Sequence, residues 1–442
     1  MKRALALGLL VAVAAAALAQ PPSPERRAAT EADYRATLAR LGIASIRPGA
    51  DGFNRNAPNA ANYDEAKAGM ASPLPPLLRT ADGRPVTSAS IWWHVRRPEL
   101  VAILDREIYG RVPANAPEIQ WVLASSERRE KAGIPVVTDH YRGHAGGGKV
   151  DIELDLTLPA AAHARVPVVM ELGFPEGFHF PGFPIPPKTG ADWMEQIVAR
   201  GWGYAILVPN TIQADDGAGL KEGVIGLASG GRPRASDEWG ALRAWAWGAS
   251  RALDRLRADP RVDGSRVAIE GLSRYGKAAL VTMAYDPRFS IGFIGSSGAG
   301  GAKLLRRDFG ERVENLAASG EYHWFAPNFI RYAGPLHTAD LPVDAHELIA
   351  LAAPRPLFIG AGTVEHGDGW VDPRGSFEAA RAASPVWRLL GVPGLVGNDF
   401  PPVGEARDAG RLAYREHQDG HTNGPNWPAF LAFAARQWHL AR

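Results

Sequence analysis

The sequence predicts an α/β protein with a mostly parallel, doubly wound sheet in a three-layer sandwich, preceded by antiparallel strands. Two patterns indicate this class. From residue 166 onward, short apolar runs alternate with helical segments, which is typical of βαβ units whose sheet is covered on both faces. Before that point, residues 151–158 alternate Ile or Leu with Asp, Glu or Thr at every second position. That period is typical of a half-buried strand, so we expect antiparallel pairing at the start of the sheet.

The elements follow from apolar periodicity and from the glycines and prolines that end each run. Strands are expected at residues 119–124, 136–141, 151–158, 166–172, 203–208, 266–270, 291–294 and 356–361. Helices are expected at residues 31–41, 101–109, 192–200, 238–258, 278–284 and 429–440. An antiparallel start followed by a doubly wound sheet is the α/β-hydrolase arrangement. In such sheets, chemistry collects at the carboxyl ends of the strands.

The first residues read as a targeting segment. A basic start, an apolar run over residues 5–16 and an A-x-A pattern before residue 20 predict a secretory signal peptide over residues 1–19. We therefore expect a secreted or periplasmic protein. Residues 20–90, rich in Pro, Ala, Asn and Arg, are expected to form an extended N-terminal arm, and residues 91–442 the catalytic domain.

Composition excludes several kinds of function. The 442 residues are 46% hydrophobic and 22% charged, the balance of a globular protein. Lys and Arg number 49 against 47 Asp and Glu, so no strong field attracts nucleic acid or an anionic membrane, and we expect neither as a partner. The chain has no cysteine, which excludes disulfides, Cys-ligated zinc, iron–sulfur clusters and a thiol nucleophile. We expect a monomer.

Ser273 is the candidate nucleophile. It lies between an expected strand and an expected helix, with Gly271 two residues before it and Gly276 three residues after it. A nucleophile elbow needs small residues there, because strand and helix approach closely around the strained serine. The usual pattern is G-x-S-x-G, whereas Tyr275 stands at the second position here. The alternative is an ordinary turn in which the serine caps the helix.

A base and an acid should follow the serine along the chain, because a hydroxyl needs a base to become a good nucleophile. His421, in a glycine-flanked loop before the last helix, is the candidate base, and His417 is its competitor. Three carboxylates after the strand at 356–361 compete for the acid: Glu365, Asp368 and Asp372. Asp368 is favoured because it lies between two glycines in a tight turn. A metal site built from Glu365, His366 and Asp368 lacks the usual ligand spacing, so no metal is expected.

Several motifs together resemble one family. Gly271-Leu272-Ser273-Arg274-Tyr275-Gly276-Lys277 is similar to the G-C-S-R-x-G-K motif of the glucuronoyl esterases, carbohydrate esterase family 15. Residues 296–302 resemble the family's S-G-x-G-G-A segment, and residues 306–311, 323–325, 353–356 and 367–370 fit its bacterial members. The resemblance covers residues 90 to 440, approximately. It implies hydrolysis of the ester between (4-O-methyl)-D-glucuronic acid of xylan and lignin alcohols, without a metal or organic cofactor.

The resemblance also implies roles for individual residues. Arg274 would help bind the oxyanion, and Lys277, Glu311 and Trp370 would contact sugar hydroxyls. Ser296 stands where fungal members have their catalytic Glu, and some bacterial relatives carry the acid after the penultimate strand instead, which matches Asp368. Glucuronoxylan or a lignin–carbohydrate ester would be the substrate. Two alternatives are an acetyl xylan esterase or general esterase on the same fold, and a catalytically silent protein that only binds polysaccharide.

Overall fold

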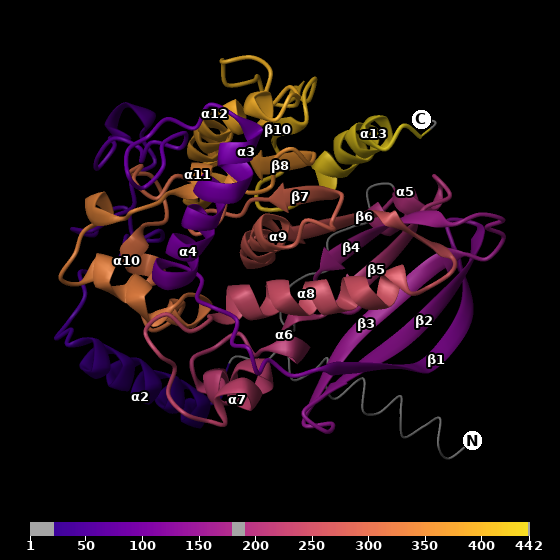
Figure 1. Ribbon diagram of the computed structural model, residues 1–442, viewed down its shortest axis with the longest axis horizontal. Coiled ribbons are helices and arrows are strands. Elements are labelled where there is room, and N and C mark those ends of the chain that lie inside the picture. The colour runs from indigo at the N-terminus through magenta and orange to yellow at the C-terminus, as the bar shows by residue number, and fades with distance from the viewer. Residues whose placement is uncertain (1–21, 179–190, 441–442) are drawn as a thin grey trace.

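A computed structural model describes residues 22–178 and 191–440 (Figure 1). The predicted signal segment lies outside the described residues. Within them, the chain forms a ten-stranded sheet in the order β1-β2-β3-β5-β4-β6-β7-β8-β10-β9. Strands β1, β2 and β3 are antiparallel to one another, and the neighbours from β5 through β4, β6, β7 and β8 to β10 run parallel. The predicted antiparallel start and parallel body are therefore confirmed.

The strands are β1 (Ile119–Lys131), β2 (Ile134–Ala145), β3 (Val150–Pro159), β4 (Val166–Leu172), β5 (Gly203–Leu207), β6 (Val262–Leu272), β7 (Ile291–Gly295), β8 (Leu357–Gly362), β9 (Ala406–Arg407) and β10 (Leu412–His417). The α-helices are α2 (Pro24–Leu41), α3 (Ala89–Ile91), α4 (Arg97–Glu107), α5 (Trp193–Val198), α6 (Pro209–Ile212), α7 (Gly223–Ser229), α8 (Ala241–Arg257), α9 (Arg274–Tyr285), α10 (Val313–Leu316), α11 (Ala345–Ala350), α12 (Pro373–Leu389) and α13 (Trp427–Gln437).

Helices cover both faces of the sheet, because successive strand residues point to opposite sides. Along β4, Val168 and Met170 pack in the larger core with α8 and α9, whereas Val169 packs in a second core with α5 and α13. Figure 1 shows α8 and α9 in one layer and α13 on the other side of the parallel strands. The carboxyl ends of β6, β7 and β8 meet at one edge, where the candidate residues lie.

Every predicted strand is present, but the sequence underestimated the first hairpin. β1 extends to Lys131 rather than ending at residue 124, and most of its side chains are exposed. Where a strand extends beyond the core, its side chains do not alternate between apolar and polar. The full length of β1 could therefore not be predicted from the sequence. Helix α2 likewise begins at Pro24, seven residues before the expected start. The sequence analysis did not locate α12 or the last strands, β9 and β10.

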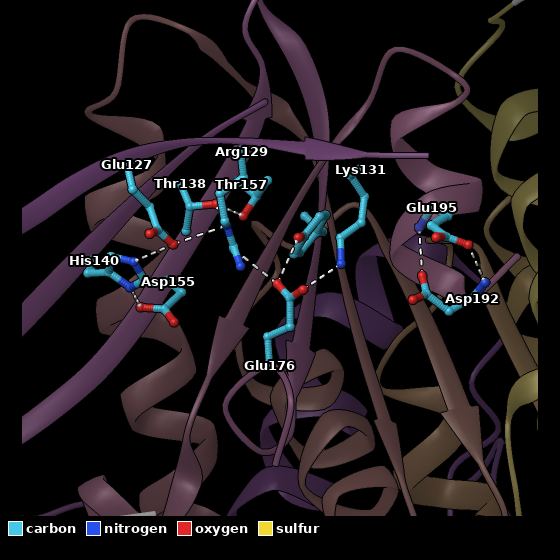
Figure 2. Close-up of polar contacts among 11 residues, drawn as sticks. Glu127, Arg129, Lys131, Thr138, His140, Asp155, Thr157, Glu176, Asp192 and Glu195 are labelled. Carbon is cyan, nitrogen blue, oxygen red and sulfur yellow. Dashed lines mark hydrogen bonds and ion pairs between the residues drawn. The ribbon is translucent and has the colours of Figure 1, made fainter. Parts of the chain in front are cut away.

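The segment that leaves β4 is fixed to the antiparallel hairpin. The carboxylate of Glu176 accepts hydrogen bonds from Arg129 Nη2 at 3.1 Å, Lys131 Nζ at 2.5 Å and the hydroxyl of Tyr204 at 3.2 Å (Figure 2). Burial opposes ionisation of Glu176, but the bond and charge of Lys131 outweigh it and lower the pKa. The β1–β2 hairpin therefore holds the segment after β4 in place, beside the sheet edge where the candidate residues lie.

Candidate active site

Ser273 occupies a strained turn between β6 and α9. Its φ of 59° and ψ of −127° lie outside the regions that a non-glycine residue normally adopts. A Cβ on Gly271 would lie 2.3 Å from the Tyr275 carbonyl oxygen, and one on Gly276 would lie 2.6 Å from the Gly295 oxygen. Both glycines are thus required by close backbone contacts, which explains the glycine at the third position after the serine. Ser273 makes no side-chain bond to the helix, so the capping alternative has no support.

His421 is bonded to Asp368. The imidazole Nδ1 lies 2.6 Å from Asp368 Oδ1, and the carboxylate is completely buried. The other carboxylate oxygen accepts the Ser296 hydroxyl and the Gly362 backbone N–H, each at 2.6 Å. Three donors therefore fix the Asp368 side chain. Ser296, which directly follows β7, thus bonds to the candidate acid that follows β8.

The competing histidine and carboxylates have other contacts. The buried His417 lies 2.8 Å from the Thr422 carbonyl oxygen through Nε2, and its Nδ1 accepts the Asp419 backbone N–H at 3.1 Å. Burial lowers the pKa of His417. Asp372 is buried, accepts Arg307 Nη1 at 2.8 Å and caps α12, and Glu365 is exposed. The structure brings Asp368 alone of the three carboxylates to His421.

Arg274 is held by a residue that sequence reasoning missed. Asp215 Oδ2 lies 2.5 Å from Arg274 Nη1, and Asp215 Oδ1 accepts bonds from His323 at 2.9 Å and Trp324 at 2.6 Å. The guanidinium also lies over the Trp324 ring, 5.3 Å from its centroid. Burial alone would raise the pKa of Asp215, but the bond from His323 and the charge of Arg274 lower it strongly. No local pattern marks Asp215, because its partners are distant in the sequence.

Lys277 and Glu311 are bonded to each other below the surface. Lys277 Nζ lies 3.0 Å from Glu311 Oε2 and 2.7 Å from the Ala299 carbonyl oxygen, and the Ala299 N–H donates to the same Glu311 oxygen at 2.9 Å. Only 4% and 3% of the two residues' surfaces are exposed. The Trp370 carbonyl accepts the Glu311 N–H at 2.9 Å, which joins the three predicted sugar contacts into one unit.

A pocket of about 460 Å³ opens beside Trp370. One wall comes from the N-terminal part of the chain, through Gly52, Phe53, Arg55 and Tyr63, and the other from Glu321, Val364, Gly367, Gly369 and Trp370. Glu321 Oε2 is buried without a hydrogen-bond partner. Burial raises the pKa of Glu321 to about 8. Sequence reasoning missed Glu321 and this wall, because nothing local links residues 52–63 to a pocket.

The described part of the chain contains neither a metal-binding cluster nor a membrane-spanning helix. Across residues 22–178 and 191–440, no group of three or more His, Asp or Glu side chains is arranged to hold a metal ion. No helix within these ranges is long and apolar enough to cross a bilayer.

Several known proteins with a similar sequence or structure belong to one family of esterases. The family described as "Glucuronyl esterase, fungi" matches residues 234–391. A carbohydrate esterase, MZ0003, from an unknown prokaryotic organism is 32% identical over 85% of this chain and 92% of its own length. A glucuronoyl esterase of carbohydrate esterase family 15 from Teredinibacter turnerae T7901 has a TM-score of 0.87 at 46% identity, over 92% of this chain and all of that one.

The chain belongs to the glucuronoyl esterase family. As a member of carbohydrate esterase family 15 it is a carboxylic ester hydrolase with the α/β-hydrolase fold, so a catalytically silent binding protein is not supported. A family structure from Solibacter usitatus agrees, with a TM-score of 0.75 at 35% identity over 85% of this chain and all of that one. A relative from Wolfiporia cocos, 4-O-methyl-glucuronoyl methylesterase 1, is 29% identical over 75% of both chains.

Proposed function

We propose that this glucuronoyl esterase is a serine esterase that cleaves the ester between (4-O-methyl)-D-glucuronic acid of xylan and a lignin alcohol, with Ser273, His421 and Asp368 as its triad. The observation that carries the proposal is the 2.6 Å bond between a buried Asp368 and His421, at the same sheet edge as a serine in a strained elbow. Curated relatives named as 4-O-methyl-glucuronoyl methylesterases support the choice of acyl group.

The proposed reaction has two halves. Ser273 Oγ attacks the ester carbonyl while His421 Nε2 takes the hydroxyl proton, and collapse of the tetrahedral intermediate releases the alcohol with that proton. Water then attacks the acyl-enzyme with His421 again as base, which frees the glucuronic acid and restores the serine. Asp368 keeps the Nδ1 proton in place and stabilises the imidazolium.

Arg274 supplies the proposed oxyanion site together with its own backbone N–H. This N–H belongs to the first turn of α9, where it has no acceptor within the helix. A fixed cation stabilises the tetrahedral oxyanion more than the neutral ester, which is what acceleration requires. Asp215 holds the guanidinium in one orientation before substrate arrives, so little reorganisation is needed during reaction.

The uronic acid is proposed to bind in the pocket beside Trp370. The indole offers an apolar face to the sugar ring, and the Lys277–Glu311 pair offers polar atoms with no net charge. Glu321, neutral at pH 7 because of its raised pKa, can both donate to and accept from a sugar hydroxyl. The predicted signal peptide places the proposed reaction outside the cytoplasm, on glucuronoxylan or lignin–carbohydrate esters.

The test compares three substrates with the purified protein: benzyl glucuronate, benzyl galacturonate and acetylated xylan. We expect the highest kcat/KM on benzyl glucuronate and loss of that turnover in Ser273→Ala. Faster release of acetate from xylan than of benzyl alcohol would instead assign an acetyl xylan esterase. Turnover that survives in Ser273→Ala would refute the triad.

A further inference from the structure

Two glutamates lie side by side in the sheet beneath the candidate triad. Glu171 on β4 and Glu270 on β6 face each other in the register of the two parallel strands. Both point toward the layer of α5 and α13, because Val169 and Ala268, two residues earlier on each strand, pack in that layer. Glu270 is 2% exposed and lies three residues before Ser273.

Within residues 22–178 and 191–440, the strands beside this pair supply no cation. Ile206 on β5 is the other neighbour of Glu171, and Phe293 on β7 is the other neighbour of Glu270. Among the described residues, no Lys, Arg or His bonds to either carboxyl group. Titratable groups on nearby elements bond elsewhere or are exposed: Glu176 after β4, Glu195 on α5, His417 at the end of β10, Asp419 and His421 after it, and Arg436 on α13.

Two adjacent carboxylates without a cation cannot both be ionised cheaply, since each charge is removed from water and repels the other. Burial, and then the charge of Glu171, raises the pKa of Glu270 well above its ordinary value, and burial raises that of Glu171 to about 8. The pair therefore keeps at least one proton at neutral pH.

Asn423 connects this pair to the candidate base. Its Nδ2 donates to Glu270 Oε1 and lies 3.5 Å from the Gly271 carbonyl oxygen, and its own chain position is two residues after His421. A Cβ on Gly295 would lie 1.8 Å from Asn423 Oδ1, so the carboxamide is pressed against the end of β7. The Gly295 carbonyl in turn accepts the Ser273 N–H at 2.9 Å. One side chain thus joins the His421 segment to the strand ends that hold the nucleophile.

We propose that Glu270 is a positioning residue for His421: Glu270 and Glu171 form a proton-holding carboxyl pair that, through Asn423, fixes the His421 segment against the strand that carries Ser273. The inference rests on the proposed function in one respect, namely that His421 is the base. Ionisation of both carboxyl groups places two charges side by side, and their repulsion displaces Glu270 together with the Asn423 side chain that donates to it.

The consequence is a loss of rate in alkaline solution that the triad does not itself predict. A histidine base becomes more effective as it deprotonates, after which the rate should remain constant with pH. Burial raises the pKa of Glu171 to about 8 and that of Glu270 well above its ordinary value, so the pair begins to ionise as pH rises through about 8. The attachment is lost as this ionisation is completed at higher pH. A base displaced by about 1 Å loses roughly 100-fold in rate.

The first experiment measures kcat and KM of wild type and Glu270→Gln from about pH 6 to pH 10. Glutamine keeps the acceptor for Asn423, adds a donor toward Glu171 and stays neutral. We expect wild-type kcat to fall above about pH 8 with little change in KM, and Glu270→Gln to keep its neutral-pH kcat within about threefold while losing that fall. Glu153→Gln is the matched control: this glutamate also has a pKa raised by burial, but β5 separates its strand from β4, so the fall should remain.

The inference is overturned if wild type shows no alkaline loss, or if Glu270→Gln shows the same loss as wild type. A second measurement does not depend on turnover or on that variant's activity. The infrared spectrum of the intact protein at neutral pH should contain carboxylic-acid C=O absorption, to which other buried glutamates also contribute, and part of this absorption should be lost in Glu270→Gln or Glu171→Gln. Absorption that is unchanged in both variants would also overturn the inference. Absence of turnover on any ester would refute the proposed function alone, since the infrared result stands apart from it.

Discussion

At the scale of single residues, the orientation of the Asp368 carboxylate is set by three hydrogen bonds, of which the one to His421 is only one. Ser296 and the Gly362 N–H hold one oxygen, so the other is left with a fixed direction toward His421 Nδ1. Each bond to a buried carboxylate reduces the range of angles that the imidazole can adopt. The candidate acid is thus defined by its neighbours on β7 and β8 as much as by its own position in the sequence.

Removing either end of the proton pathway should stop turnover. We expect Ser273→Ala and His421→Ala each to reduce kcat by several orders of magnitude while circular dichroism shows an intact fold, and the double variant to be little worse, because triad members act as a unit. His417→Ala should mainly lower the melting temperature, since both of its ring nitrogens bond to loop backbone. If a stably folded His417→Ala lost as much kcat as His421→Ala, the assignment of His421 as the base would be wrong.

Asp368→Asn should keep the shape of the site but favour the wrong imidazole tautomer, with a rate loss on the order of 10⁴. Ser296→Ala removes one of three donors and should cost roughly tenfold in kcat. Glu365→Gln is the control and should be nearly neutral, because that side chain is exposed. Ser296→Glu should partly restore Asp368→Asn if both positions reach the same imidazole. Near-normal kcat in Asp368→Asn with collapse in Glu365→Gln would move the acid to Glu365.

Asp215→Asn tests whether the orientation of Arg274 matters. Loss of the carboxylate leaves the guanidinium without its ion partner, so we expect kcat to fall by roughly 10- to 100-fold, short of the 100- to 1,000-fold typical of a deleted oxyanion donor. Arg274→Ala gives the upper limit. The double variant should lose no more than Arg274→Ala alone, and additive losses in steady-state kinetics would show that Asp215 acts independently of Arg274.

At the scale of elements, the segment at residues 52–63 lines the pocket although it lies more than 250 residues before the opposite wall in sequence. Phe53 is fully exposed, and Arg55 lies 5.6 Å from the centre of the Tyr63 ring. Exposed aromatic and cationic groups beside a pocket are suited to bind a flat or hydroxylated ligand. We therefore expect the segment to contribute to substrate binding beyond the sheet edge.

We expect Phe53→Ala and Arg55→Ala to raise KM for glucuronoxylan fragments by roughly three- to tenfold and to leave kcat within about twofold, because they touch substrate away from the reacting bond. Leu123→Ala, an exposed apolar side chain on β1, is the matched control. Equal KM values for Phe53→Ala, Arg55→Ala and the control in initial-rate measurements would show that the segment does not bind substrate.

At the scale of the whole molecule, buried carboxyl groups should make stability depend on pH. The pKa values of Glu171 and Glu321 are raised to about 8 and that of Glu416 to about 7, in each case chiefly by burial. A carboxyl whose pKa is higher in the folded than in the unfolded state stabilises the fold fully only below its unfolded pKa, near 4, and that contribution is lost as pH rises through the folded value.

The midpoint of urea unfolding should therefore decrease between about pH 5 and pH 8. The lowered pKa of Asp215 acts in the opposite sense, but only at pH values below this window. Glu416→Gln should reduce the slope, because the amide remains neutral throughout. A midpoint that stays constant or rises from pH 5 to pH 8 would contradict the prediction.

The sequence predicted most of this arrangement where a local signal existed. Strands β4 to β8 have continuous apolar runs, and the contact of His421 with Asp368 followed from chain order and flanking glycines. Asp215 and the pocket wall could not be predicted, because their roles arise from contacts between distant segments. The same holds for the burial of Lys277 against Glu311, which no local pattern indicates.

The bond between Ser296 and Asp368 joins the ends of β7 and β8 at one point beside the imidazole. If a carboxylate at position 296 reaches the same imidazole, either strand end can supply the acid, and a lineage can exchange one for the other without moving the serine or the base. An ancestor with acids at both positions would remain active after the loss of either. Divergent members of such a family can thus share a nucleophile while inheriting their acids from different strands.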